Sequence, residues 1–246
     1  MKNLPLVWAH RGSCATAPEN TLLAFSQAVE AGADGLELDI QLTKDGEIVV
    51  CHDETLERTS NGKGWLKDFT LAELKALDFN QQFPQYGPQE IPTLREVLEL
   101  IKPTGLTIDI ELKTSYPFYD GIEEKTLALV KEFGMEDKIN YSSFNHYTCL
   151  HLLELDPSLD VGFLYFDGTI DFPAYAKAHG AKAINPAYFN LFVPGEPMKE
   201  AHRLGLRTNV WVVDEEEDVE KCIQQEVTSV ITNDPARVLK YYKIRQ

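Results

Sequence analysis

The sequence predicts an α/β fold, a (β/α)8 or TIM barrel with a small insertion after its second strand. Strand patterns alternate with helical patterns along most of the chain, and 246 residues, 43% of them hydrophobic, suffice for one large core. A doubly wound open sheet competes with this prediction, but no Gly-x-Gly-x-x-Gly fingerprint follows the first strand pattern. We therefore expect one domain over residues 1–246, with the insertion at about 53–91.

Eight segments have the apolar patterns of buried parallel strands, and a helical pattern follows each one. The strand patterns are 6–9, 35–42, 106–112, 139–142, 160–164, 182–185, 207–213 and 228–231. The helical patterns begin after Thr21, where the first one runs to Gly32, and then cover 94–101, 121–133, 146–155, 172–179, 195–204, 215–224 and the segment from Pro235. A further short helix is expected at 70–77, inside the insertion. Active sites of such barrels lie at the carboxyl ends of the strands, so polar residues there are the candidates.

The second strand pattern has one acidic face. Aliphatic residues at 36, 38, 40 and 42 alternate with Glu37, Asp39 and Gln41. The turn sequence Lys44-Asp45-Gly46 and a short strand at 47–51 complete a hairpin that ends on His52.

The strand pattern at 106–112 repeats this alternation with Asp109 and Glu111. Exposed edge strands would tolerate such carboxylates, but a closed barrel has no exposed edge, and unpaired buried carboxylates are strongly unfavourable. A cation bound by Glu37, Asp39 and Glu111 removes the conflict. Their hard oxygen ligands favour Mg²⁺ or Ca²⁺ over zinc or copper, and the sequence does not decide between the two.

Two histidines fall at strand ends beside these carboxylates. His10 is followed by Arg11, and His52 ends the hairpin. Lys113 lies two residues after Glu111, at the end of the same strand. Imidazoles suit proton transfer near neutral pH, and Arg with Lys suits a phosphate. The remaining histidines, at 146, 151, 179 and 202, lie in helical patterns and are expected to be structural, and the acidic run 214–218 is expected to be a solvated helix start.

Net charge, cysteine spacing and the N-terminal sequence limit the partners and the location expected for the protein. The formal net charge of −16 opposes binding to nucleic acid or to an anionic membrane surface. The four cysteines are widely spaced, without a zinc-like or disulfide pattern, which is typical of reduced thiols. His10 and Arg11 interrupt the first apolar run too early for a signal peptide or a membrane span, so we expect a cytoplasmic protein without stable membrane insertion.

An ordered set of motifs resembles the glycerophosphodiester phosphodiesterase family. The set comprises His10-Arg11-Gly12, Pro18-Glu19-Asn20-Thr21, Glu37-Leu38-Asp39, the run from Asp45-Gly46 to His52-Asp53, Leu56, Arg58, Thr59, Gly62, Glu111-Leu112-Lys113, Trp211 and Thr232-Asn233-Asp234-Pro235. The match is dense from residue 8 to 64 and sparser beyond. The resemblance also makes Trp211 a candidate substrate-binding residue, although the family often has Trp-Thr-Val-Asn where this chain has Trp211-Val212-Val213-Asp214.

The resemblance implies hydrolysis of glycerophosphodiesters to glycerol 3-phosphate and an alcohol, with one divalent cation on Glu37, Asp39 and Glu111. It implies that His10 and His52 are the acid–base pair, without saying which is the base, and that Arg11 and Lys113 bind the phosphate. The reaction expected is attack by the glycerol 2-hydroxyl, giving a cyclic phosphate that water opens. The head group, the role of Glu19 and the oligomeric state stay open.

Two alternatives remain. One is lysophospholipase D-like hydrolysis of lipid phosphodiesters, for which aromatic residues of the insertion (Trp65, Phe69, Phe79 and Phe83) are a candidate apolar anchor, although packing against the barrel is the simpler role for them. The other is a non-catalytic binding protein on the same fold.

Overall fold

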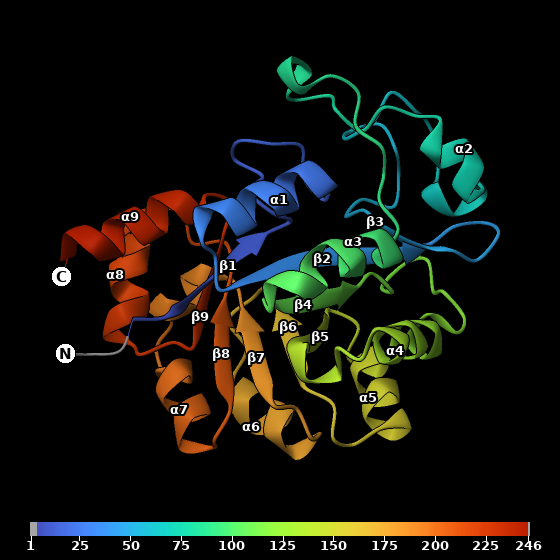
Figure 1. The fold of residues 1–246 in the computed structure, drawn as a ribbon. Coiled ribbons are helices and arrows are strands. Elements are labelled where there is room, and N and C mark those ends of the chain that lie inside the picture. Colours follow the sequence, from blue (N-terminus) through green and yellow to red (C-terminus); the bar gives the residue numbers. More distant parts are fainter. Residues whose placement is uncertain (1–3, 246) are drawn as a thin grey trace.

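A closed barrel of parallel strands forms the centre of the computed structural model, which describes residues 4–245 (Figure 1). Its strands are β1 (Leu6–His10), β2 (Gly35–Leu42), β4 (Thr107–Leu112), β5 (Ile139–Ser143), β6 (Val161–Tyr165), β7 (Ala183–Pro186), β8 (Arg207–Val210) and β9 (Ser229–Thr232). They pair in parallel around the sheet, and β1 pairs with both β9 and β2, which closes it. The predicted (β/α)8 barrel is confirmed.

Helices surround the barrel and follow its strands in the chain. They are α1 (Leu22–Ala31), α3 (Leu94–Ile101), α4 (Ile122–Phe133), α5 (His146–Leu155), α6 (Phe172–Ala178), α7 (Pro197–Arg203), α8 (Glu216–Gln224) and α9 (Pro235–Arg245), with short 3-10 turns at Lys102–Thr104, Glu136–Lys138 and Tyr188–Phe192. The first helix shows how local sequence sets these bounds. The Thr21 hydroxyl accepts a hydrogen bond from the Ala24 amide, and Gly32 ends the helix at φ 83°, a conformation that glycine adopts without steric cost.

The two acidic strands are neighbours, as the predicted metal site requires. Strand β2 pairs in parallel with β4, so that Glu37 lies opposite Asp109 and Asp39 opposite Glu111. On its other side β2 pairs with β1, where His10 lies opposite Glu37. The aliphatic residues of both strands belong to the main apolar core, and the alternating residues face the barrel interior.

The hairpin after β2 leads into the segment that the sequence predicts to be an insertion. Strand β3 (Ile48–Val50) is antiparallel to β2 and one residue shorter at each end than predicted. The following segment contains the short turns Leu66–Asp68 and Pro84–Tyr86 and the helix α2 (Leu71–Lys75), which begins at a Thr70 capping box. It has a small apolar cluster, consisting of Val49, Cys51, Leu56, Leu66, Leu74, Phe79 and Ile91. Figure 1 shows this segment projecting beyond β3, away from α8 and α9.

Strand β8 is shorter than predicted. It ends at Val210 rather than at Val213, because the chain leaves the regular ladder there. Trp211 forms an isolated bridge with Ala187, and the Val213 amide donates to the carbonyl of Ile231. Strand β2 has the predicted bounds, and each of the other strands differs from the prediction by at most one residue at either end.

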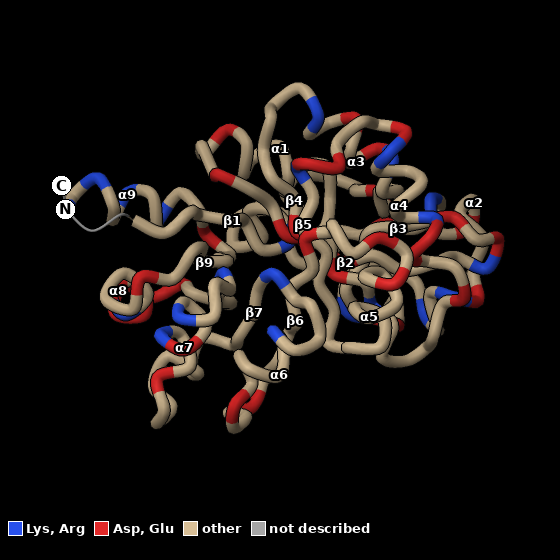
Figure 2. The backbone as a smooth tube through the Cα atoms, turned by 90° about the horizontal axis from the view of Figure 1, so that it is seen from below, with Lys and Arg blue, Asp and Glu red and all other residues tan. Residues whose placement is uncertain are grey.

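Charged residues are spread over the outer helices and loops, with acidic positions also on strands in the middle of the barrel (Figure 2). Within residues 4–245, no helix combines the length and the apolar character needed to cross a bilayer. The acidic residues in the barrel interior are the exception to the usual placement of charge, and they mark the candidate site.

Candidate active site

Three carboxylates from β2 and β4 meet at one end of the barrel. One oxygen each of Glu37, Asp39 and Glu111 lies within 4.8 Å of the other two, and the three residues are at most 8% exposed. Asp39 Oδ1 is buried without a hydrogen-bond partner. Buried hard oxygens with such an unsatisfied atom fit a divalent cation, because a cation supplies the missing partner.

Burial and the positive charges of Arg11 and Lys113 determine the pKa values of these three carboxyl groups. Burial raises the pKa of Glu37 well above its usual value, and the negative charge of Asp39 adds to the effect. Burial also raises the pKa of Glu111, although Lys113 opposes it with its ammonium 2.9 Å from Glu111 Oε1. Burial also acts to raise the pKa of Asp39. Neighbouring positive charges outweigh this effect and lower the pKa, and the largest contribution comes from Arg11, whose Nε is 3.3 Å from Asp39 Oδ2. Without a metal, burial therefore shifts both glutamates toward the protonated form.

His10 is the last residue of β1 and lies opposite Glu37 in the sheet. Its Nδ1 is 2.7 Å from Asn233 Oδ1, and its Nε2 is 3.9 Å from Glu37 Oε2. Burial lowers the pKa of His10 to about 4, and the neighbouring Arg11 charge acts in the same direction. The imidazole is therefore neutral at physiological pH.

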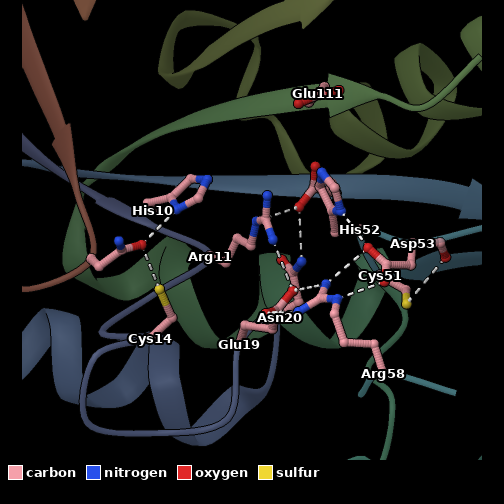
Figure 3. A network of polar contacts seen from close by, with 12 residues as sticks. His10, Arg11, Cys14, Glu19, Asn20, Cys51, His52, Asp53, Arg58 and Glu111 are labelled. Carbon is pink, nitrogen blue, oxygen red and sulfur yellow. Dashed lines mark hydrogen bonds and ion pairs between the residues drawn. The ribbon is translucent and has the colours of Figure 1, made fainter. Parts of the chain in front are cut away.

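His52 reaches the same pocket from the hairpin and has a charged partner. Its Nδ1 is 2.6 Å from Asp53 Oδ1. Arg58 holds Asp53 through two hydrogen bonds, of 2.6 and 2.9 Å, and holds Glu19 through two more. Glu19 in turn accepts a hydrogen bond from Arg11, so one network joins the loop after β1 to the segment after β3 (Figure 3). Glu19, whose role the sequence leaves open, thus supports the site indirectly by holding Arg11 and Arg58.

The pocket between these groups has a volume of about 190 Å³. It is lined by His10, Arg11, Glu37, His52, Asp109, Glu111, Ser142, Phe144, Leu164, Trp211, Val212 and Ile231. Two of the sequence-predicted residues do not line the pocket. Asp39 instead contacts Arg11, and Lys113 contacts Glu111. The structure thus brings together all eight predicted site residues.

Aromatic side chains form one wall of the pocket. Trp211 meets Phe144 edge to face at 5.6 Å between ring centroids, and its Nε1 donates to the carbonyl of Asn185. None of the four other histidines lines this pocket. A larger cavity of about 320 Å³ lies between the loops after β6 and β7, but its lining contains no Arg, Lys or His, so it does not suit a phosphate.

Sequence reasoning missed two residues that contact the site. Asp214 was expected to be part of a solvated helix start, and this is wrong: helix α8 begins at Glu216, and the Asp214 carboxylate accepts hydrogen bonds from the Thr232 hydroxyl and from the amide and side chain of Asn233. Asn233 then contacts His10. The signals available were the Thr-Asn-Asp-Pro motif and the unusual Asp at 214.

Comparisons with known proteins agree with this geometry. The model of the Glycerophosphoryl diester phosphodiesterase family matches residues 10–237. A glycerophosphodiester phosphodiesterase of Caldanaerobacter subterraneus subsp. tengcongensis is 43% identical over 235 residues, covering 95% of this chain and 96% of that protein, and one of Bacillus altitudinis is 38% identical over 236 residues, covering 95% and 96%.

Solved structures give the same result. A phosphodiesterase of Oleispira antarctica, solved in complex with the product sn-glycerol-3-phosphate, superposes with a TM-score of 0.85 at 28% identity, covering 98% of this chain and 97% of that one. Family model, close relatives and fold thus agree over nearly the whole chain. The chain belongs to the glycerophosphoryl diester phosphodiesterase family of hydrolases.

Proposed function

We propose that the protein hydrolyses glycerophosphodiesters to glycerol 3-phosphate and an alcohol, in a reaction that depends on one divalent cation, Mg²⁺ or Ca²⁺. The observation that carries this proposal is one pocket lined by two imidazoles, the Arg11 guanidinium and two of the three clustered carboxylates. The third carboxylate, Asp39, contacts Arg11, and Lys113 contacts Glu111. A relative that binds sn-glycerol-3-phosphate supports the substrate class. We assign the activity to a single domain, residues 1–246 with the insertion at about 53–91, and to the cytoplasm, since the four cysteines are unpaired.

Glu37, Asp39 and Glu111 would hold the cation. When bound, it supplies Lewis acidity, which lowers the pKa of a coordinated hydroxyl and stabilises negative charge on the phosphate. Arg11 and Lys113 bring positive charge to the same place, and each already contacts a carboxylate of the cluster. Their role is to orient the phosphate against the two histidines.

His10 and His52 move the protons. One imidazole takes the proton of the glycerol 2-hydroxyl, whose oxygen forms a bond to phosphorus, while the other gives a proton to the departing alcohol as its bond to phosphorus breaks. The product of this step is a cyclic phosphate. Water then opens the ring with the roles of the two imidazoles reversed, which restores both protonation states and releases glycerol 3-phosphate.

An assay of purified protein with glycerophosphocholine tests this proposal. With added Mg²⁺ or Ca²⁺ we expect release of glycerol 3-phosphate, and we expect none in excess chelator. The His10→Gln variant is the matched control for contaminating activity. If no glycerol 3-phosphate is released with either ion, the proposal fails, which leaves lysophospholipid hydrolysis or a non-catalytic binding protein on the same fold.

Aromatic residues at the mouth of the pocket favour a second candidate, hydrolysis of lysophospholipids. From Trp211 the rings continue to Phe166 at 6.0 Å and from there to Phe189 at 4.9 Å, and Phe166 is 55% exposed. Such a path outward from a phosphate site suits an apolar chain.

Two aromatic residues of the insertion pack within it and do not extend this surface. Phe79 is buried and Phe69 packs against the small apolar cluster, whereas Trp65 is 38% exposed. Turnover of glycerophosphocholine and of lysophosphatidylcholine should be compared in the wild type and in Phe166→Ala. A loss of turnover in the variant that is confined to the lysolipid would support this candidate. Equal turnover of the lysolipid by both proteins would exclude a role for the aromatic path, and no turnover of the lysolipid by the wild type would exclude the candidate itself.

A further inference from the structure

Two residues outside the predicted site, Asp214 and Asn233, form a hydrogen-bonded chain that ends on His10. Asp214 lies between β8 and α8, and Asn233 directly follows β9. The Asp214 carboxylate divides its bonds: Oδ1 accepts from the Thr232 hydroxyl and the Asn233 amide, both at 2.8 Å, and Oδ2 accepts from the Asn233 side-chain nitrogen at 2.6 Å. Asp214 is thereby fixed in one orientation.

This chain fixes which way the Asn233 amide points. An ionised carboxylate only accepts hydrogen bonds, so the NH₂ group of Asn233 has to face Asp214. The carbonyl oxygen, Oδ1, then faces His10, with its Nδ1 at 2.7 Å, and the thiol of Cys14, with its Sγ at 2.8 Å (Figure 3). Because Oδ1 can only accept, the His10 nitrogen that faces it is the one that carries hydrogen.

The opposite nitrogen of His10 is the one that lies near the metal-binding carboxylates. Nε2 is 3.9 Å from Glu37 Oε2, and His10 lines the pocket. We infer that Asp214 and Asn233 are positioning residues that hold His10 as the Nδ1-protonated tautomer, so that Nε2 accepts the proton of the attacking hydroxyl. This inference rests on the proposed function for its role in the reaction, but the tautomer itself does not depend on activity.

His52 supplies the second proton-transfer group of this assignment. Its Nδ1 faces the carboxylate of Asp53 at 2.6 Å, and Arg58 holds that carboxylate in place. Because a carboxylate oxygen only accepts hydrogen bonds, Nδ1 of His52 carries hydrogen and its Nε2 is the nitrogen left for the reaction. When Nε2 of His10 takes the hydroxyl proton in the first step, His52 gives its Nε2 proton to the departing alcohol, and the two exchange roles in the second step.

An exchange of the two side chains provides the test. In Asp214→Asn, an NH₂ group replaces Oδ2 and meets the NH₂ group of Asn233, so the Asn233 amide turns over and presents NH₂ to His10. In Asn233→Asp, two carboxylates meet instead. In the double variant, the amide introduced at position 214 keeps an oxygen for Thr232 and the backbone amide. Its NH₂ group donates to the carboxylate introduced at position 233, which again accepts from His10.

We expect each single variant to lose kcat on the order of 100-fold with KM within about twofold, because a wrong tautomer or a misplaced base affects the chemical step rather than binding. The double variant should recover to within about fivefold of the wild type. Glu217→Gln, which removes an exposed charge from the same acidic run, should change neither constant. Wild-type kcat in Asp214→Asn, or a double variant no more active than the weaker single one, would overturn the inference.

Nitrogen NMR of ¹⁵N-histidine-labelled protein supplies a readout that needs no turnover. The His10 signals are identified by their loss in His10→Gln. We expect hydrogen on Nδ1 in the wild type and in the double variant, and on Nε2 in Asp214→Asn. Hydrogen on Nε2 in the wild type would refute the inference even in a fully active enzyme. An inactive wild type with hydrogen on Nδ1 would instead refute the proposed function and leave the tautomer assignment standing.

Discussion

Replacing Asp109 by asparagine tests the electrostatics of the barrel interior. Asp109 is 1% exposed and accepts a hydrogen bond from Asn185 at 3.2 Å, while its Oδ1 is buried without a partner. Burial, with a contribution from the charge of Glu111, raises the pKa of Asp109 to about 8. At pH 7 the side chain is therefore mainly the neutral acid, which asparagine imitates in shape and charge.

The sign and size of the effect follow from linkage. In the unfolded chain the pKa of an aspartate is about 3.9, so it is ionised throughout the range from pH 7 to 9. The folded protein holds the Asp109 proton until the pH passes about 8, and the stability that this proton provides is lost as the pH rises through that value. Between pH 7 and 9 the loss amounts to about 1.4 kcal/mol, which Asp109→Asn does not suffer.

Urea unfolding at pH 7, 8 and 9, in excess chelator and followed by tryptophan fluorescence, measures this difference. The wild type should lose stability relative to Asp109→Asn by about 1.4 kcal/mol over the range. Asp120→Asn is the control, because Asp120 is exposed and its replacement should give a curve parallel to the wild type. Parallel curves for Asp109→Asn and the wild type would mean that Asp109 is already ionised at pH 7, which would refute the reasoning.

Three further predictions concern the metal ligands, the hydrogen-bond network around Arg58 and the apolar core. Glu37→Gln should weaken Mg²⁺ or Ca²⁺ binding in calorimetry at least about tenfold and abolish turnover, whereas His10→Gln should abolish turnover alone. Arg58→Gln, which breaks the bonds to Asp53 and Glu19, should lower kcat about tenfold with little change in KM, and an unchanged kcat would contradict the role of that network. Phe25→Ala, at a fully buried site on α1, should cost about 3–5 kcal/mol in urea unfolding, while Leu22→Ala, 37% exposed on the same helix, should cost about 1 kcal/mol or less.

The barrel and its acidic strands were predictable because local patterns carry them. The alternation around Glu37 and Asp39 repeats around Glu111, and buried carboxylates at two strand ends need a common partner. Their adjacency was an assumption until the register of β2 against β4 confirmed it. Strand ends also carried His10 and His52, whose position in the chain alone placed them at the mouth of the barrel.

Other features depend on contacts that no local pattern encodes. Asp214 begins a run of acidic residues that suits a helix N-terminus, and only the side chain of Asn233 beside it reveals its different role. The early end of β8 depends on where Trp211 meets Ala187 across the sheet. The aromatic path from Trp211 to Phe166 and Phe189 is assembled from loops that are separate in sequence, so its continuity appears only in the folded protein.

The closure of the barrel has a consequence for the protein during its synthesis. His10 and Asn233 are separated by 223 residues, so translation at about 5–20 residues per second leaves the histidine without this partner for roughly 10 to 45 s. During that time β1 also lacks its pairing with β9, and one edge of the growing sheet is open. A nascent chain thus carries its acidic cluster long before Asn233 can contact His10. Closure of the barrel and formation of the contact between His10 and Asn233 both require the last strand, so they occur together at the end of synthesis.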